Sequence, residues 1–495
     1  MNTTPFFPVL RAQLAAQGQR TSQSLRRLDF PPLLQQLRRL LPPELLACAD
    51  EGPNSRDRIF SLRLTFECFL WQMLKPRTAC REVVRAVQAL FETTGRGSVD
   101  EGTAAYVQAR QRLPVERLEN ALACTARTAD RRVGRQGQLQ GRPVKVADCS
   151  TTQLPDTAQN QKRYPQPSSQ KPGCGFPLIK FLVLFSLSSG AILRVAMAHW
   201  KNHDLRLLHG LWKALEKGDI LLGDRAYGEY LTLATLPGKG VNVVARLHGA
   251  RRVDFRKASQ RLGHHDGLFQ WRKGYQQSEI LSVKEWRQVP EQITVRLLRF
   301  DALIRRRKRR ITLVTTLLDP AAYPASQMIG LYARRWHLEL ALRHLKTTMG
   351  MELLRCQSPD MAEKELFAYL VAYNLIRCLM AQAVAQAGVE MERLSFKGAL
   401  DAVRQFAPAF HGARSKAQRQ HIWQELVRTI TRDLVPLRPH RQEPRAVKRR
   451  PKAYQLLNKP RHIFKEVPHR CRYYNKVTLK NRGLIQAPFR SVLTF

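Results

Sequence analysis

The sequence predicts a mixed α/β fold, with helical segments on both sides of a β-containing middle. Residues 1–140 have helical apolar spacing and a basic composition. From about residue 141 the pattern changes to short apolar runs and period-two alternation, which indicate strands. Strands and helices alternating in one segment are typical of a mixed α/β layer.

The charge balance predicts a polyanionic partner. Lys and Arg total 83 and Asp and Glu total 39, which gives a net charge of +44, while 44% of residues are hydrophobic. A chain that can build apolar cores yet carries this excess of cations would repel itself without a polyanion, and nucleic acid is the first candidate. The longest apolar region, residues 181–198, is broken by a Ser-Ser-Gly turn and contains Arg194. It reads as a hairpin, so no membrane partner is expected.

The cysteines and the N-terminus favour a reducing compartment. The nine cysteines are scattered and never form a Cys-x-x-Cys pair, which argues against a disulfide framework or a zinc ribbon. The first residues lack a basic region followed by an apolar run, so no signal peptide is expected. We therefore expect a cytoplasmic protein that is associated with the nucleoid when bound to DNA.

The N-terminal segment, residues 1–140, is predicted to contact DNA through helices. Residues 80–91 and 103–113 give two helical patterns separated by a glycine-containing turn at 94–97. The second helix is expected to expose Gln108, Arg110 and Arg112. Two short helices around such a turn can form a helix-turn-helix reader, and an ordinary basic bundle is the equal alternative.

Residues 141–247 are predicted to form the first part of a catalytic core. Two short strands in this segment each end in an acid, Asp148 or Asp224. The expected elements are a strand at 144–148, a hairpin of 181–187 with 191–198, a helix at 205–216, and strands at 219–224 and 241–247.

The remaining segments complete the predicted organisation. Residues 248–316 lean towards β structure and include an Arg-rich run, 305–310, that we expect to be an exposed loop. Residues 317–395 carry two helical patterns and are predicted to complete the core. Residues 396–437 are predicted to be helices, and 438–495 a basic, largely irregular tail that binds polyanions.

One helical stretch, residues 332–346, gathers chemically active side chains on one face. At about 100° per residue, its polar face holds Tyr332, Arg335, Glu339 and Lys346 within about 60° of one another. Trp336 lies beside them, and a leucine stripe next to this face can seat the helix on a core. Ser326 can cap the start of the helix and Gly350 can end it. The simpler interpretation is a surface helix whose Glu339 forms spacing-four ion pairs.

Asp148, Asp224 and Glu339 together suggest a divalent-cation site. Carboxylates near one another are costly unless a cation lies between them, and one or two carboxylates for each ion suit Mg²⁺. Two such ions can activate a nucleophile on one side of a phosphate and stabilise the leaving oxygen on the other. Taken singly, Asp148 could be a turn cap and Asp224 could pair with Arg225.

The residues on that helix carry a family resemblance. Tyr332, Arg335, Glu339 and Lys346 fill a Tyr-x2-Arg-x3-Glu-x6-Lys pattern without departure, and the segments around Asp148 and Asp224 also match. The chain resembles bacterial insertion-sequence transposases of the Asp-Asp-Glu (DDE) type in the branch related to insertion sequence four. The likeness covers roughly residues 60–460, and one departure is Cys149, where glycine is more usual.

The resemblance implies a fold, a mechanism and roles for these residues. It implies an RNase H-like catalytic core with a β-rich insertion, flanked by a helical N-terminal domain and a helical, basic C-terminal region. Asp148, Asp224 and Glu339 would be catalytic and would hold two Mg²⁺ ions, for which Mn²⁺ can substitute. Tyr332, Arg335, Trp336 and Lys346 would bind DNA.

The same likeness implies the partners. These would be the terminal inverted repeats of a transposon and its target DNA, both double-stranded, with the protein a homodimer in the DNA complex. Some relatives flip a base onto a tryptophan of the insertion, for which Trp271 and Trp286 are candidates; core packing is the alternative for both.

The activity expected from this likeness is cut-and-paste transposition, in which strands are cut at transposon ends and 3′-hydroxyls are joined to target DNA. A metal-dependent nuclease without strand transfer would use the same acids. A non-catalytic DNA-binding derivative is the alternative from another class.

Overall fold

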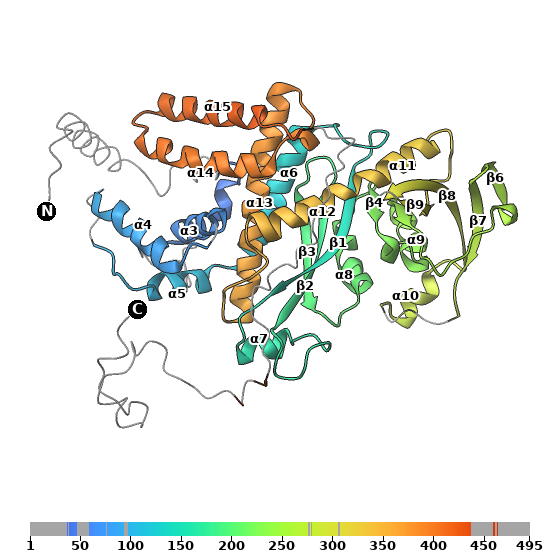
Figure 1. Ribbon diagram of the computed structural model, residues 1–495, viewed down its shortest axis with the longest axis horizontal. Helices are drawn as coiled ribbons and strands as arrows, with labels where there is room; N and C mark the ends of the chain where they lie inside the picture. Colours follow the sequence, from blue (N-terminus) through green and yellow to red (C-terminus); the bar gives the residue numbers. More distant parts are fainter. Residues whose placement is uncertain are drawn as a thin grey trace.

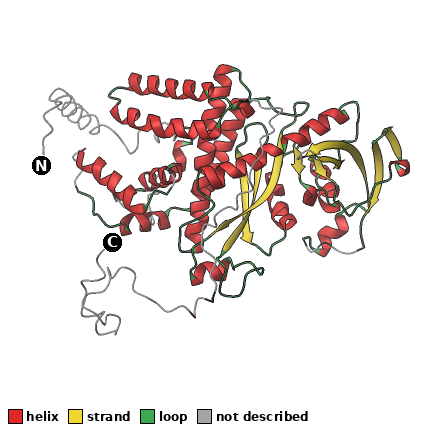
Figure 2. Cartoon of the chain, viewed as in Figure 1, coloured by secondary structure: helices red, strands yellow, loops and turns green. Residues whose placement is uncertain are grey.

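The chain is described by a computed structural model that covers residues 37, 39–46, 59–75, 77–93, 98–275, 278, 280–304, 307–436, 459–460 and 463. Helices predominate on one side of the molecule and strands on the other (Figure 1, Figure 2). The predicted turn at 94–97 and nearly all of the predicted tail at 438–495 lie outside the described residues.

Within the described residues the strands form a nine-stranded sheet in the order β3-β2-β1-β4-β5-β9-β8-β7-β6. The central strands β1, β4 and β5 run parallel, and the flanking pairs are antiparallel. The bounds are β1 (Val144–Gln153), β2 (Leu178–Ser186), β3 (Ile192–His199), β4 (Ile220–Gly223), β5 (Asn242–Arg246), β6 (Gln260–Gly263), β7 (Asp266–Arg272), β8 (Gln292–Ile304) and β9 (Arg307–Thr315).

The helices precede, cover and follow this sheet. Their bounds are α3 (Leu62–Leu74), α4 (Cys80–Thr93), α5 (Ala104–Arg112), α6 (Val115–Val133), α7 (Ala158–Arg163), α8 (Asp204–Leu211), α9 (Tyr230–Thr235), α10 (Val283–Gln288), α11 (Ala325–Arg334), α12 (Trp336–Arg343), α13 (Pro359–Ala387), α14 (Phe396–Gly412) and α15 (Lys416–Arg432).

The two faces of the central strands pack into two different cores, because successive strand residues point to opposite faces. Val146 and Leu222 belong to the larger core, which also holds the apolar faces of α6, α12 and α13. Ala147 and Leu221 belong to the smaller core with α8 and α9. The alternation therefore decides which side chains of β1 and β4 can face α12.

Helix α13 is the centre of the larger core. It is long and apolar enough to cross a membrane by length and composition, yet 89% of its apolar stretch is buried inside the protein. It lies alongside α6 and also packs against α14 and α15 (Figure 1). These contacts explain its apolar composition as that of a core helix.

Most predicted elements of the middle of the chain are confirmed. The hairpin of β2 and β3, helix α8, and strands β4 and β5 occur within one to three residues of the predicted bounds, except that α8 ends at Leu211 and continues as a 3-10 turn to Ala214. Two predictions are wrong: the exposed loop at 305–310 and the exposure of Arg110. In the predicted loop at 305–310, Arg307 to Arg310 lie in β9 because they pair with β8, and residues 305–306 lie outside the described residues. Arg110 is 7% exposed, because it packs into the helical side of the molecule.

The strands of residues 248–316 do not form a separate sheet. Strand β9 pairs with β5, so the central sheet continues directly into β8, β7 and β6. Trp271 and Trp286 are partly buried against the smaller core, and the cations of Arg251 and Lys273 lie over their rings. Both tryptophans therefore take part in packing.

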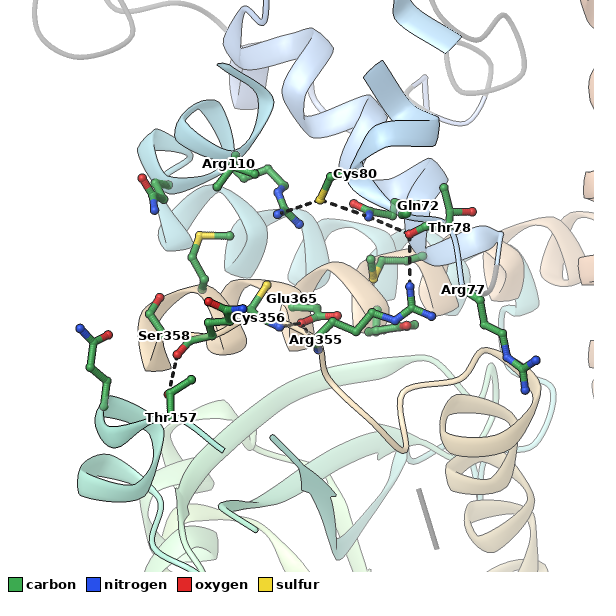
Figure 3. Close-up of a pocket in the computed structure, with 18 of the residues that line it drawn as sticks. Gln72, Arg77, Thr78, Cys80, Arg110, Thr157, Arg355, Cys356, Ser358 and Glu365 are labelled. Atoms are coloured by element: carbon green, nitrogen blue, oxygen red, sulfur yellow. Dashed lines mark hydrogen bonds between the residues drawn. The ribbon is translucent and has the colours of Figure 1, made fainter. Parts of the chain in front are cut away.

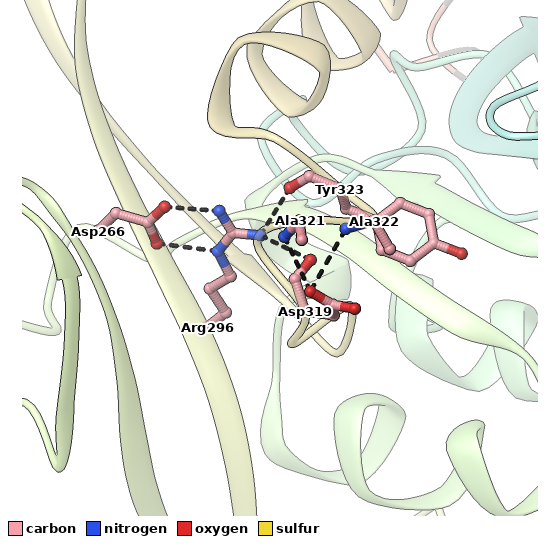
Figure 4. Close-up of polar contacts among 6 residues, drawn as sticks. All are labelled: Asp266, Arg296, Asp319, Ala321, Ala322 and Tyr323. Carbon is pink, nitrogen blue, oxygen red and sulfur yellow. Dashed lines mark hydrogen bonds and ion pairs between the residues drawn. The ribbon is translucent and has the colours of Figure 1, made fainter.

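A buried arginine ties these strands to the segment that leads into α11 (Figure 4). Arg296 on β8 is fully buried and forms two hydrogen bonds with Asp266, at 2.8 and 2.5 Å. Its Nη1 donates to the carbonyls of Tyr323 at 2.7 Å and Asp319 at 3.4 Å. Asp319 in turn accepts from the backbone N–H groups of Ala321 and Ala322. This network fixes the entry to α11 and α12.

Candidate active site

Asp148 and Asp224 lie at matching positions on neighbouring parallel strands. The register pairs Val146 of β1 with Leu222 of β4. Each aspartate follows its paired residue by two positions, so both point to the same face of the sheet. Since neighbouring strands are about 4.8 Å apart, the two carboxylates are neighbours on the face covered by α12.

The prediction that Asp148 ends its strand is wrong. Strand β1 continues to Gln153, because residues 149–153 keep their pairing with β2. What ends at Val146 is the pairing of β1 with β4. Asp148 therefore lies just beyond the last β1–β4 pair, with one edge of its strand free of β4. Asp224 directly follows β4, as predicted, and accepts a hydrogen bond from the N–H of Arg225 at 2.7 Å.

The predicted helix at 332–346 is present in three pieces. Helix α11 ends at Arg334, Arg335 forms the junction, α12 begins at Trp336, and a π-helical turn follows from His344 to Thr348. Pro324 stands at the start of α11 without a side-chain cap, so the prediction of a Ser326 cap is wrong. Gly350 follows the turn with φ +87°, which suits its predicted role in ending the helix.

The π-helical turn brings Lys346 to β1. A wider turn changes the direction of Lys346 relative to a straight α-helix. Its Nζ donates to the Oγ of Ser150 at 3.3 Å, two residues beyond Asp148. The chain after the turn bonds to the end of β1, with Thr152 Oγ1 donating to the Met351 carbonyl at 2.6 Å. Sequence spacing gave no signal for the Ser150 contact.

Arg335 lies among the three carboxylates. Its Nη2 donates to Glu339 Oε1 at 2.8 Å, so one of the ion pairs of the simpler surface-helix interpretation is present. Its cation also acts on Asp148 and Asp224, which together with Tyr332 and Glu339 raise the pKa of Arg335 although burial opposes this. The Tyr332 ring lies 6.0 Å from the guanidinium.

The electrostatics of Asp148 reflect its surroundings. Burial raises the pKa of Asp148 to about 6, against an ordinary value of 3.8. The Arg335 cation and the N–H of Cys149 lower it, whereas the charges of Asp224 and Glu339 raise it further. A carboxyl that is disfavoured as an anion by burial and by two like charges is in the kind of place where a cation binds.

The donor set fits a hard divalent cation, although it is not assembled as it stands. Among the described residues, no three Asp, Glu, His or Cys side chains lie close enough to hold a metal ion. The three acids present only carboxylate oxygens, which Mg²⁺ prefers. The guanidinium of Arg335 occupies the position of a counter-cation, bonded to one of the three carboxylates. A metal would therefore require the Arg335–Glu339 pair to open.

Trp336 is exposed to solvent, whereas Cys149 is partly buried against the smaller core. Trp336 is 58% exposed, so it does not pack into the core. Cys149 points to the opposite face from Asp148, where its Sγ accepts a hydrogen bond from the Tyr227 hydroxyl at 3.9 Å. Burial raises the pKa of the Cys149 thiol to about 12. A side chain larger than glycine is therefore accommodated without touching the carboxylates.

Comparisons with known proteins point to transposases. Residues 139–375, which include all three acids, match the family model described as "Transposase DDE domain". The chain is similar to the transposase InsG of insertion sequence element IS4 from Escherichia coli (strain K12), with 26% identity over 428 residues, 85% of this chain and 93% of the relative.

Shorter similarities point the same way. A stretch of 64 residues, 13% of this chain and 17% of each relative, is 38% identical to the transposase of insertion sequence element IS421 from Escherichia coli. The same figures hold for the putative transposase InsL of element IS186A from Escherichia coli (strain K12).

Proposed function

Because this chain belongs to the DDE transposases of insertion sequences related to IS4, we propose that it cuts DNA at transposon ends and joins the released 3′-hydroxyls to target DNA. The observation that carries the proposal is that Asp148 and Asp224 are neighbours on adjacent strands, where the charges of Glu339 and Arg335 also act on Asp148. The relative is named as the transposase for insertion sequence element IS4, and its similarity to this chain covers most of both chains.

In the proposed mechanism Asp148, Asp224 and Glu339 would hold two Mg²⁺ ions, for which Mn²⁺ could substitute. When bound, such ions lower the pKa of the attacking water or hydroxyl and neutralise charge on the transferring phosphate. The protein's contribution is to fix the positions of the carboxylates, two beside the paired strands β1 and β4 and one on the facing helix α12. The carboxylates must be ionised to bind a metal ion. Because the pKa of Asp148 is raised to about 6, its carboxyl is mostly protonated below about pH 6.

The basic and aromatic residues of α11, α12 and the π turn are proposed to hold the DNA. Arg335, once released from Glu339, would bind a phosphate bidentately, and Lys346 would bind a second phosphate from its place beside Ser150. Tyr332 would position Arg335 through the contact of its ring. Trp336 is exposed enough to stack on a base.

We assign the RNase H-like core to the strands β3-β2-β1-β4-β5 with the helices that cover them. The order of these strands and the position of both aspartates on its central pair support this assignment. Residues 248–316 would then be the insertion, and residues 1–140 and 396–495 the flanking DNA-contacting regions. Helix α6 shares the core of the sheet, so the N-terminal region is anchored on the catalytic part.

We also propose that two copies of the chain act together on the two ends of the element, in the cytoplasm at the nucleoid. Pairing two ends requires two active sites, and the net charge of +44 suits a long polyanion.

The decisive assay combines pre-cut transposon-end DNA, a target plasmid and Mg²⁺. Joined products support the proposal. Cleavage without joining would favour a plain nuclease, which uses the same acids. DNA binding without cleavage would favour a non-catalytic derivative. The sequence of the terminal repeats can be sought in the DNA that flanks the coding region.

A further inference from the structure

A large cavity lies away from the three carboxylates, between the N-terminal helices and the start of α13 (Figure 3). Its volume is about 750 Å³, within the range of ligand pockets in proteins. Its walls come from α3, α5 and residues 77–80 at the start of α4 on one side, and from the start of α7 and the segment 355–369 on the other. None of Asp148, Asp224 and Glu339 lines it.

The cavity wall contains a buried cation, Arg110, that forms no hydrogen bond with a carboxylate among the described residues. Arg110 is 7% exposed and lies between the rings of Phe69 and Tyr106, at 5.2 and 5.0 Å from their centroids. Its Nη2 donates to the thiol sulfur of Cys80 at 3.3 Å, and its Nε is buried without a hydrogen-bond partner. Among the described residues Arg110 forms no salt bridge, and a buried charge is costly unless it is paired.

The one acidic side chain among the residues that line the cavity is already engaged. Glu365 is 3% exposed, and its Oε2 accepts hydrogen bonds from the backbone N–H groups of Arg355 and Cys356, both at 2.9 Å. Burial raises the pKa of Glu365, whereas the N–H groups of Arg355 and Cys356 and the charge of Arg110 lower it, so this one acid offsets only part of the positive charge around it. The cavity therefore keeps an excess of positive charge from Arg110, Arg355 and Arg77.

The start of helix α13 at the cavity adds to this excess. Helix α13 starts directly after Ser358, whose side chain makes no capping hydrogen bond, whereas the start of α4 at Cys80 is already capped by Glu82, which accepts from the N–H of Ala79 at 3.1 Å. The N-terminus of a helix carries partial positive charge and free N–H groups that bind anions. The start of α13 reinforces Arg110, whose unpaired Nε is the independent sign that an anion belongs here.

We propose that this cavity binds the phosphate group of a nucleotide, either within the DNA backbone or in a free nucleotide. A phosphate matches the planar fork of a guanidinium, and the volume leaves room for an attached sugar and base. Bound there, the nucleotide would join the N-terminal helices to α13 and so hold DNA across both parts. The inference rests on the proposed function only in taking DNA as one source of the phosphate.

The thiol of Cys80 provides a site-specific readout in the full chain. Cys80 is partly exposed and its sulfur is bonded by Arg110, so a ligand on Arg110 should shield it. Cys124 is a matched internal control, because it is also partly exposed and accepts a hydrogen bond from an arginine, Arg127 at 3.2 Å, but does not line the cavity. Alkylation of both cysteines by N-ethylmaleimide is followed by peptide mass spectrometry.

The probes are inorganic phosphate, deoxyadenosine monophosphate and a short DNA duplex. At a probe concentration about ten times Kd we expect alkylation of Cys80 to slow about tenfold, and that of Cys124 to stay unchanged. Protection by the duplex alone identifies the DNA backbone as the source, whereas protection by the monophosphate as well identifies a free nucleotide as a further source. No protection by any probe would overturn the inference.

Three variants separate the pocket from general DNA contact. Arg355→Gln at the exposed rim and Arg110→Gln inside should each abolish most of the protection, with folding checked by circular dichroism. Arg81→Gln removes the same charge from an exposed position on α4 that does not line the cavity, and this variant should retain the protection. Full protection in both pocket variants would also overturn the inference. Strand cutting measured in parallel is independent: protection without cutting refutes only the proposed function, and cutting without protection refutes only the pocket.

Discussion

Replacing Asp148 with asparagine should stabilise the fold while removing strand cutting. The change keeps the shape of the side chain and the hydrogen bond from the N–H of Cys149 at 2.9 Å. It removes a carboxylate whose ionised form is disfavoured by burial and by Asp224 and Glu339. Loss of a metal ligand at the reacting centre should abolish cutting, as should Asp148→Ala, while salt-sensitive DNA binding remains largely in place.

The size of the stabilisation follows from the raised pKa. The difference between about 6 in the folded protein and the ordinary 3.8 corresponds to about 3 kcal/mol, at about 1.4 kcal/mol for each tenfold change in the proton equilibrium. Above about pH 6 the folded state carries this full cost, because Asp148 is ionised there. Below about pH 4 the carboxyl is neutral in both the folded and unfolded states, and the cost disappears.

The assay is urea denaturation of wild type and Asp148→Asn in the presence of EDTA, from pH 4 to pH 8. We expect the variant to gain up to about 3 kcal/mol at pH 8 and almost nothing at pH 4. Asp100→Asn, in an exposed loop, is the matched control and should show no such trend. An equal gain at both pH values would refute the electrostatic reasoning, and cutting by the variant would refute the catalytic assignment.

Other predictions test the framework and the DNA contacts. Arg296→Met should destabilise the fold by about 3–5 kcal/mol, because it leaves Asp266 largely buried without its partner; a urea midpoint equal to wild type would contradict this. Lys346→Ala should weaken DNA-end binding and reduce the slope of log affinity against log salt by about 0.9, and an unchanged slope would remove Lys346 from the phosphate contacts. Trp336→Ala should leave stability near wild type, since the side chain is 58% exposed. If Trp336 stacks on a base, the change should weaken binding to DNA with unpaired ends by about 1–3 kcal/mol, measured by fluorescence anisotropy, and equal affinity would argue against stacking.

The sequence predicted the parts of the site that local patterns determine. The short apolar runs of β1 and β4 indicated strands, the leucine stripe beside Glu339 indicated the buried side of its helix, and these elements are present. Asp224 was placed correctly because β4 is short and bounded by glycine and a charged turn.

Other features depend on contacts between distant segments. Strand β1 continues past Asp148 because β2 supplies partners for it, which no local pattern in residues 144–153 reveals. Arg110 looked exposed on a short polar helix, yet Phe69, more than forty positions away, covers it. The π-helical turn that brings Lys346 to Ser150 depends in the same way on the pairing of β1 with the segment after the turn.

The central claim is that Asp148, Asp224 and Glu339 share divalent cations. A crystal structure of the full chain bound to transposon-end DNA, grown with Mn²⁺, tests it through the anomalous signal of the metal. We predict Mn²⁺ at about 2 Å from oxygens of all three side chains, with Arg335 moved from Glu339 to a phosphate. Mn²⁺ bound elsewhere, with the Arg335–Glu339 pair intact in a complex that has cut its DNA, would contradict the account.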